Sequence, residues 1–308
     1  MPSARFEEVL GKLDAALDFC RSLGLGGLVE RGRFAEHRRR IQELIPLITH
    51  VDESGLSKAG VERLRGGQVH FATALIEALE FAEALEHLRG VNPEALKRKL
   101  EVVLTGPPLP INEDASSTNA ARNTLFELYL ASRIVAGGLP VELGEHPDLT
   151  CRMGEVEILI ECKRPFSPSG VSRAAKQALD QLHQEIPSRP AGAFGLIAVS
   201  TAKVLNPGDS FLSYYDEHRA SEGLSRMLLE ISEQEPTKRV LLQAAKDGRI
   251  VGALFHVSTV ALDRTAERFT LAIQLNVHPI ALGQEALKHL GEAIARGAKY
   301  VGVTKSGR

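Results

Sequence analysis

The stretch that decides the fold is PDLTCRMGEVEILIECKRP, residues 147–165. Its residues alternate on both sides of a Gly-Glu pair, which predicts two short strands joined by a tight turn near residues 153–155. The second strand is apolar over VEILI but ends on Glu161 and Lys163, which point to one face because side chains alternate along a strand. A buried carboxylate and ammonium are costly without partners or a function. We therefore expect a site at the end of this strand.

The hairpin brings a third charged side chain to the same level. Asp148 begins the first strand directly after Pro147, and pairing across the turn places it near Glu161 and Lys163. Taken alone, Asp148 could be a turn residue, and the Glu-Lys pair could be a salt bridge at a solvated strand end. The combination is informative because the chain has no second Glu-x-Lys or Asp-x-Lys.

A fourth candidate, Glu127, lies in the predicted helix NAARNTLFELYLASRIVAGG, residues 119–138. Helical spacing places Glu127 on a small apolar face, where a carboxylate is unfavourable unless it has a partner or a function. Two readings stay open: a functional carboxylate, or a helix Glu paired with Arg122 or Arg133.

Two or three carboxylates beside one lysine suit a hard cation. Mg²⁺ prefers one or two carboxylates, with water and substrate phosphate oxygens completing its coordination shell. Such an ion lowers the pKa of a bound water and stabilises charge on phosphoryl oxygens. A lysine beside it can orient that water or stabilise the transition state. The residue types therefore point to metal-assisted hydrolysis of a phosphodiester.

The order helix-Glu, strand, Pro-Asp, hairpin, Glu-x-Lys, helix, strand resembles the PD-(D/E)xK nuclease superfamily, which has a restriction-endonuclease-like fold. The resemblance covers an α-β-β-β-α-β core between residues 117 and 200. It implies that Asp148 and Glu161 bind Mg²⁺, with Mn²⁺ able to substitute. It also implies that the backbone carbonyl of Cys162 adds a ligand and that Lys163 assists the nucleophile. Glu127 matches a first-helix Glu that serves as a metal or water ligand.

Basic and polar residues flank the expected site and are candidates for contacting nucleic-acid phosphates: Arg152, Arg164, Arg173, Lys176 and Gln177. A solvated polar face is the alternative for the basic ones. Some superfamily members carry a Gln-x-x-x-Tyr motif on the following helix, but no Tyr follows Gln177 or Gln181 at that distance. The most basic run, RGRFAEHRRR at 31–40, has no aromatic residues at stacking positions, which favours a charged helix face over a phosphate patch.

The chain divides into two predicted regions. Periodic apolar residues predict an all-α domain over residues 1–104, with helices at FEEVLGKLDAALDFCRSL, FAEHRRRIQELIPLI, HFATALIEALEFAEALEHL and NPEALKRKLEVVL. Residues 105–116 are rich in Pro without periodicity and are expected to be a linker. Residues 117–308 are expected to form the nuclease-like α/β domain, with a buried strand at FGLIAVST, a long strand pair after residue 249, and helices near VSRAAKQALDQLHQEI, GLSRMLLEISEQ, TKRVLLQAAKDG and GQEALKHLGEAIARG.

The composition is that of a globular chain of 308 residues, 44% hydrophobic and 25% charged. A net charge of −2 excludes a protein that coats nucleic acid through overall charge, so such a partner must meet a local patch. The three cysteines favour a reducing, cytoplasmic compartment, and Cys20 and Cys162 are expected to be small buried residues. The sequence shows no secretory signal and no apolar run long enough to span a membrane.

The sequence therefore predicts a cytoplasmic, Mg²⁺-dependent nuclease, endo or exo. The resemblance implies nucleic acid as the substrate, DNA rather than RNA, and a role in defence or repair. By analogy with nucleases of this family, the N-terminal helices are candidates for a homodimer interface. Two alternatives stay open. One is a nuclease-like fold that binds nucleic acid or protein without turnover. The other is an unrelated α/β protein whose helical domain binds a partner protein.

Overall fold

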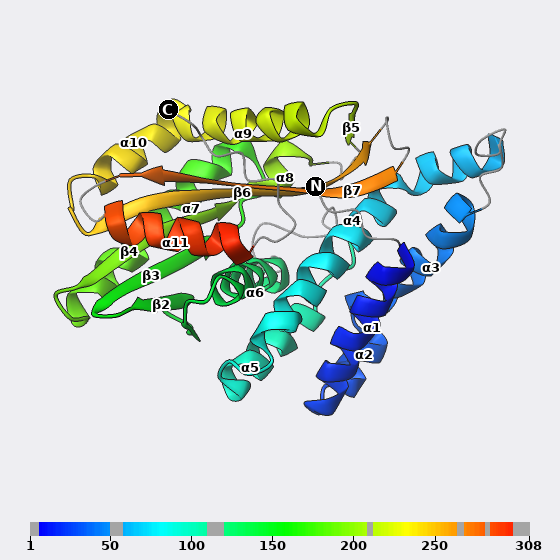
Figure 1. Cartoon of the computed structure of the whole chain (residues 1–308), viewed down its shortest axis with the longest axis horizontal. Helices are drawn as coiled ribbons and strands as arrows, with labels where there is room; N and C mark the ends of the chain where they lie inside the picture. Colours follow the sequence, from blue (N-terminus) through cyan, green and yellow to red (C-terminus); the bar gives the residue numbers. More distant parts are fainter. Residues whose placement is uncertain are drawn as a thin grey trace.

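The N-terminal part of the chain is helical and the remainder is built around a sheet (Figure 1). The computed structural model describes residues 6–49, 58–109, 120–207, 212–263, 268–280 and 284–297. The leading helices are α1 (Phe6–Ser22), α2 (Gly26–Arg31), α3 (Arg33–Thr49), α4 (Lys58–Leu88) and α5 (Pro93–Leu104). Within these described residues, no helix is both long and apolar enough to cross a membrane.

Within the described residues the strands form one mixed sheet of seven strands. They are β1 (Val141–Leu143), β2 (Leu149–Met153), β3 (Val156–Lys163), β4 (Ala193–Ser200), β5 (Leu212–Tyr214), β6 (Ile250–Asp263) and β7 (Arg268–Pro279). The order is β1-β2-β3-β4-β6-β5, and β7 also pairs with β6. The first three strands are antiparallel, whereas β3, β4 and β6 run parallel. An α/β fold preceded by helices is therefore confirmed in this general form.

The expected α-β-β-β-α-β order is present as α6 (Ala120–Ala136), β1, β2, β3, α7 (Pro168–Glu185) and β4. Beyond it come α8 (Ala202–Leu205), α9 (Glu217–Glu233), α10 (Glu235–Ala244) and α11 (Gln284–Gly297). The sequence did not predict α2, α8, β5 or a 3₁₀ turn at Ile186–Ser188, because such short elements show too few repeats of a period.

Helices cover both faces of the sheet. Alternate residues of β3 separate accordingly: Ile158 and Ile160 join a cluster with α6 and α11, whereas Leu159 joins one with α7, α9 and α10. This follows from the strand period of two, which sends neighbouring side chains to opposite faces. Strands buried on both faces are continuous apolar runs, as in VEILI and FGLIAVS.

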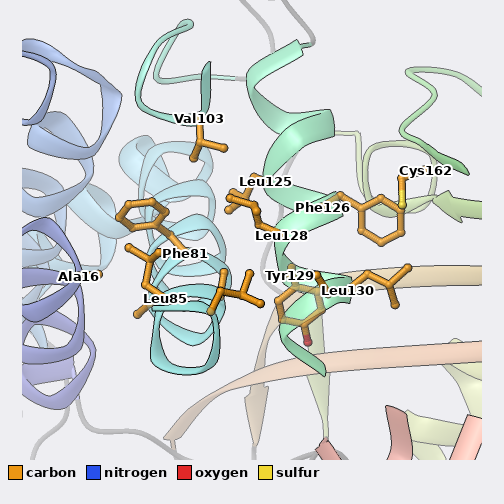
Figure 2. Close-up of a cluster of buried hydrophobic side chains, with 14 of the residues drawn as sticks. Ala16, Phe81, Leu85, Val103, Leu125, Phe126, Leu128, Tyr129, Leu130 and Cys162 are labelled. Atoms are coloured by element: carbon orange, nitrogen blue, oxygen red, sulfur yellow. The ribbon is translucent and has the colours of Figure 1, made fainter. Parts of the chain in front are cut away.

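One hydrophobic core joins the N-terminal helices to the sheet. Figure 2 shows Phe81 and Leu85 of α4 on one side of α6 and Cys162 of β3 on the other, with Leu125 and Phe126 of α6 between them. The same buried cluster includes residues of α1, α3, α5 and α11. The two predicted regions thus differ in secondary structure but share a core. Of the predicted linker, residues 110–116 lie outside the described residues.

Three buried or nearly buried glutamates also tie α4 to the second half of the chain. They are spaced by three residues, so they lie along one side of the helix. Their partners come from α6 and β6: Glu77 with Arg122, Glu80 with Ser258, and Glu83 with Arg133. Because a buried charge without its partner is costly, these pairs specify how α4 sits against the α/β part.

The three cysteines are buried free thiols. Burial raises the pKa of both Cys20 and Cys151 to about 12. Burial, followed by the negative charges of Asp148 and Glu127, also raises the pKa of the Cys162 thiol. The prediction that Cys20 and Cys162 are small buried residues is confirmed.

Candidate active site

The register of the β2–β3 hairpin brings two acidic side chains together. Leu149 pairs with Ile160, so Asp148, one residue earlier, lies opposite Glu161. The Oδ2 atom of Asp148 accepts a hydrogen bond of 2.7 Å from the backbone N–H of Cys162. This bond fixes the Asp148 carboxylate at the carboxyl end of β3, as the hairpin pattern in the sequence predicts.

A tight loop between β1 and β2 delivers Asp148 to that position. The N–H of Gly144 donates a hydrogen bond of 3.0 Å to the carbonyl of Asp148, which closes the loop. A Cβ atom at Gly144 would lie 2.3 Å from the carbonyl oxygen of Pro147. Residue 144 therefore has to be glycine for the backbone to approach this closely.

Lys163 lies between the two carboxylates. Its Nζ atom donates to Oε2 of Glu161 at 2.9 Å and lies 3.6 Å from Oδ2 of Asp148. Its side chain is 13% exposed, so the ion pairs are largely shielded from water. Burial by itself would lower the pKa of Lys163, but the charges of Asp148 and Glu161 outweigh it and the pKa is raised. Lys163 is therefore an ammonium ion under ordinary conditions.

Glu127 comes to the same place from α6, but its partner is not one that the sequence suggested. Lys99 of α5 donates a hydrogen bond of 2.5 Å to Oε2 of Glu127. The alternative pairing with Arg122 or Arg133 is wrong, because these arginines bind Glu77 and Glu83 of α4.

A pocket of about 350 Å³ opens beside these side chains. One wall is α5, and the other side is formed by the start of α6 and the loop that leads to Asp148. Its lining residues are Ala95, Arg98, Lys99, Val102, Thr124, Glu127, Leu143, Gly144, Glu145 and Asp148. Of the acidic site residues, Glu127 and Asp148 line this pocket, together with the basic residues Arg98 and Lys99 of α5.

The carboxylates repel one another. Burial, and then the charge of Asp148, raises the pKa of Glu127 to about 7 despite the Lys99 ammonium. The same two causes raise the pKa of Glu161 to about 7 despite Lys163. Three acidic groups therefore share two ammonium groups, an arrangement that attracts a further positive charge.

The Oε1 atom of Glu161 is buried and has no hydrogen-bond partner among the described residues. Most buried polar atoms are satisfied, so such an oxygen indicates a missing partner. No group of three or more His, Cys, Asp or Glu side chains in the described part of the chain is arranged to hold a metal ion by itself. A cation here would have to complete its coordination with backbone, water or substrate oxygens.

The residues predicted to contact nucleic-acid phosphates beside the site do not form one patch in the structure. Arg152 lies opposite Glu157 at the far end of the hairpin and is paired with Glu142 and Glu157. Arg164 is buried, and its charge acts on Glu80 of α4. Neither position suits a phosphate contact at this site.

The candidates on α7 differ from each other. Lys176 is paired with Asp180 one turn later. Arg173 and Gln177 are exposed and form no ion pair or hydrogen bond within the described part of the chain. These two stay predictions for substrate contact.

The basic run at 31–40 is a charged helix face, as expected. Arg38 pairs with Asp14, and Arg39 and Arg40 pair with Glu36 and Glu43 on their own helix. These internal pairs occupy the charges that a phosphate patch would need.

Lys99 is the site residue that the sequence did not reveal. The triplet Lys97-Arg98-Lys99 is visible in a predicted helix, but basic triplets are common on helix surfaces. Only the packing of α5 beside α6 brings Lys99 to Glu127, and a contact between residues 28 positions apart leaves no spacing signal.

The chain matches no protein-family model, no curated protein and no solved structure. Its function is therefore argued from the geometry of the site.

Proposed function

We propose that the chain is a Mg²⁺-dependent nuclease of the PD-(D/E)xK type. The observation that carries the proposal is the convergence of Asp148, Glu161 and Lys163 at the carboxyl end of β3, with Glu127 reaching them from α6. The order of elements around this set matches the order expected of the restriction-endonuclease-like core. Fold alone does not determine function, so the proposal depends on the side chains.

Asp148 and Glu161 would hold the ion, with the Cys162 carbonyl as a further oxygen donor and Glu127 as the ligand of a water bound to the ion. The unpartnered Oε1 atom of Glu161 and the surplus of carboxylates over ammonium groups both fit a cation. One or two carboxylates suffice for Mg²⁺, because it keeps several waters and takes substrate phosphate oxygens. When bound, the ion would stabilise charge on the phosphoryl oxygens and lower the pKa of a water. Mn²⁺ is expected to substitute.

The chain's own residues have distinct roles in this proposal. Lys163 keeps its proton, so it donates hydrogen bonds that orient the attacking water or stabilise the charge that develops on the phosphate. Glu127, on the α6 side of the pocket that Asp148 also lines, would accept a proton from that water.

The wider expectations are part of the same proposal. They are a preference for DNA over RNA, a role in defence or repair, a cytoplasmic location and a homodimer through the N-terminal helices. The chain is nearly neutral, so the substrate must be gripped by local basic residues.

The proposal is tested by cleavage of supercoiled plasmid, linear duplex, single-stranded DNA and RNA in Mg²⁺, Mn²⁺ or EDTA. Asp148→Asn and Lys163→Met should each lower the rate by about a hundredfold or more, since each removes a group that acts on the transition state. Arg152→Ala is the matched control, because Arg152 is a charged residue at the far end of the same hairpin.

A second readout separates the alternatives. A metal site should raise the melting temperature in Mg²⁺ or Mn²⁺ by mass action, and Asp148→Asn should reduce that rise. Metal-dependent stabilisation and nucleic-acid binding without cleavage would favour the binding module. No cleavage, no binding and no effect of metal on melting would reject the nuclease and favour an unrelated α/β protein.

A further inference from the structure

The wall of the pocket opposite Asp148 belongs to the N-terminal helices. Ala95, Arg98, Lys99 and Val102 of α5 line the pocket, and their spacing of three and four residues puts them on one helical face. Two of the four are basic. The helical part of the chain therefore supplies cations to a pocket that is also lined by the carboxylates of Glu127, Glu145 and Asp148.

Arg98 is exposed at this pocket and forms no ion pair with any residue that the structure describes. By contrast, Arg38, Arg39 and Arg40 of α3 are all engaged in ion pairs. A guanidinium group carries several N–H donors in a planar fork that fits a phosphate group. Arg98 thus has its whole donor set available beside the acidic residues.

Lys99 is closer to the acidic residues and only partly committed. Its ammonium group has three N–H donors, and one of them goes to Glu127. The ion pair holds the side chain, 13% exposed, at the inner end of the pocket. Two donors remain for an anion that enters from the open side.

We propose that α5 is the phosphate-binding wall of this site, with Arg98 and Lys99 holding backbone phosphates of the nucleic-acid strand beside the scissile bond. The inference rests on the proposed nuclease function and assigns substrate positioning to the N-terminal helices. It accounts for how a chain with a net charge of −2 holds a polyanion. The attraction is local to one helix face, so it is independent of overall charge.

The test measures binding of a short fluorescein-labelled DNA duplex and of the matching single strand by anisotropy, with the full chain in EDTA. Arg98→Ala should weaken binding about tenfold and lower the slope of log Kd against log salt by about one, as loss of one phosphate contact does. Arg98→Lys, which retains the charge but not the planar fork, should bind more tightly than Arg98→Ala and more weakly than the wild type. Lys97→Ala is the matched control, because Lys97 lies on the same helix but does not line the pocket.

A paired substitution separates a phosphate contact from simple neutralisation of Glu127. Lys99→Met alone removes the ammonium and leaves Glu127 without it, so weaker binding would follow from either role. Lys99→Met combined with Glu127→Gln removes both charges. We expect this double variant still to bind DNA about tenfold more weakly than the wild type, because the phosphate has lost its donor.

The outcomes are distinct. Equal effects of Arg98→Ala and Lys97→Ala, or wild-type affinity in the double variant, would overturn the role of α5 while leaving a nuclease that binds and cleaves. A wild-type chain that neither binds nor cleaves any nucleic acid would reject the proposed function itself, and this inference with it.

Discussion

Glu161 carries two features that a purely structural residue would not combine. Its side chain is fully buried, and one carboxylate oxygen has no hydrogen-bond partner among the described residues. Burial and Asp148 raise its pKa to about 7. The folded, metal-free chain therefore releases this proton near pH 7, whereas an unfolded chain loses it near the ordinary glutamate pKa of 4.5.

This raised pKa predicts how stability changes with pH in EDTA. Since the folded pKa exceeds the unfolded one, the contribution of Glu161 is present below about pH 4.5 and is lost as the pH rises through about 7. Glu161→Gln mimics the protonated group, so at pH 8 it should be more stable than the wild type by about 3 kcal/mol, because the pKa rises from 4.5 to about 7 and each pKa unit is worth about 1.4 kcal/mol. At pH 4.5 the two should be equal. Urea unfolding at both pH values checks this, and a Gln variant less stable at pH 8 would contradict it.

The sequence revealed the residues of the site that share a hairpin. In a hairpin, the strand period of two and the tight turn determine which residues face each other. The sequence therefore predicts that Asp148, Glu161 and Lys163 lie close together, as they do in the structure. Glu127 stood out as a carboxylate on an apolar helix face, but its role came from the family resemblance, and the partner expected for it was wrong. The Lys99–Glu127 pair depends on how two helices pack, which no local pattern encodes.

The loop between β1 and β2 positions Asp148 through its backbone. Gly144 closes it by donating to the Asp148 carbonyl, and the space for a side chain at residue 144 is taken by the Pro147 carbonyl. The position of the Asp148 carboxylate therefore depends on the backbone conformation of this loop.

Gly144→Ala should displace this loop, because the new Cβ would meet backbone and not a flexible side chain. We expect a loss of about 1–3 kcal/mol in the free energy of unfolding and a fall in Mg²⁺-dependent cleavage at temperatures where the variant stays folded. Gly11→Ala is the control: nothing lies within 4 Å of its Cβ, and α1 should gain about 0.5–1 kcal/mol from it. Full activity in Gly144→Ala would contradict the positioning role.

Longer elements were predicted well for a physical reason. The helices of the first hundred residues, the hairpin and the β6–β7 pair all repeat their period several times. The sequence does not predict the order of strands in the sheet. In that order, β5 pairs with the far end of β6, beyond the stretch that pairs with β4. Such an arrangement depends on contacts between distant segments and leaves no periodic signal.

One hydrophobic cluster spans the predicted domain boundary, because it contains residues of the N-terminal helices, of α6 and of the sheet. Beside the shared hydrophobic cluster lies a buried charged group: Glu77 of α4 accepts from Arg122 of α6 and from His37 of α3, with Arg33 3.4 Å away. Burial would raise the pKa of Glu77, but the positive charges of Arg122 and Arg33 hold it well below its usual range. Residues from both predicted regions therefore depend on one carboxylate.

Glu77→Gln should destabilise the whole molecule and not only the helices. It removes the buried carboxylate charge that lies beside Arg33 and Arg122, at a cost of about 3–5 kcal/mol. Hydrogen exchange should show amides of β4 losing protection together with those of α4. Glu101→Gln, at an exposed position of α5, should change stability by less than about 0.5 kcal/mol. Unchanged exchange in β4 beside faster exchange in α4 would indicate two independent units.

The burial of the three cysteines has a practical consequence for attaching a label at one chosen position of this protein. With the pKa of Cys20 and Cys151 at about 12 and that of Cys162 raised as well, hardly any native thiolate is available to maleimide dyes. A single surface cysteine, introduced at exposed Tyr215 for example, would react first. The natural chain is thus already suited to single-site fluorescent or spin labelling, with no need to remove its own cysteines.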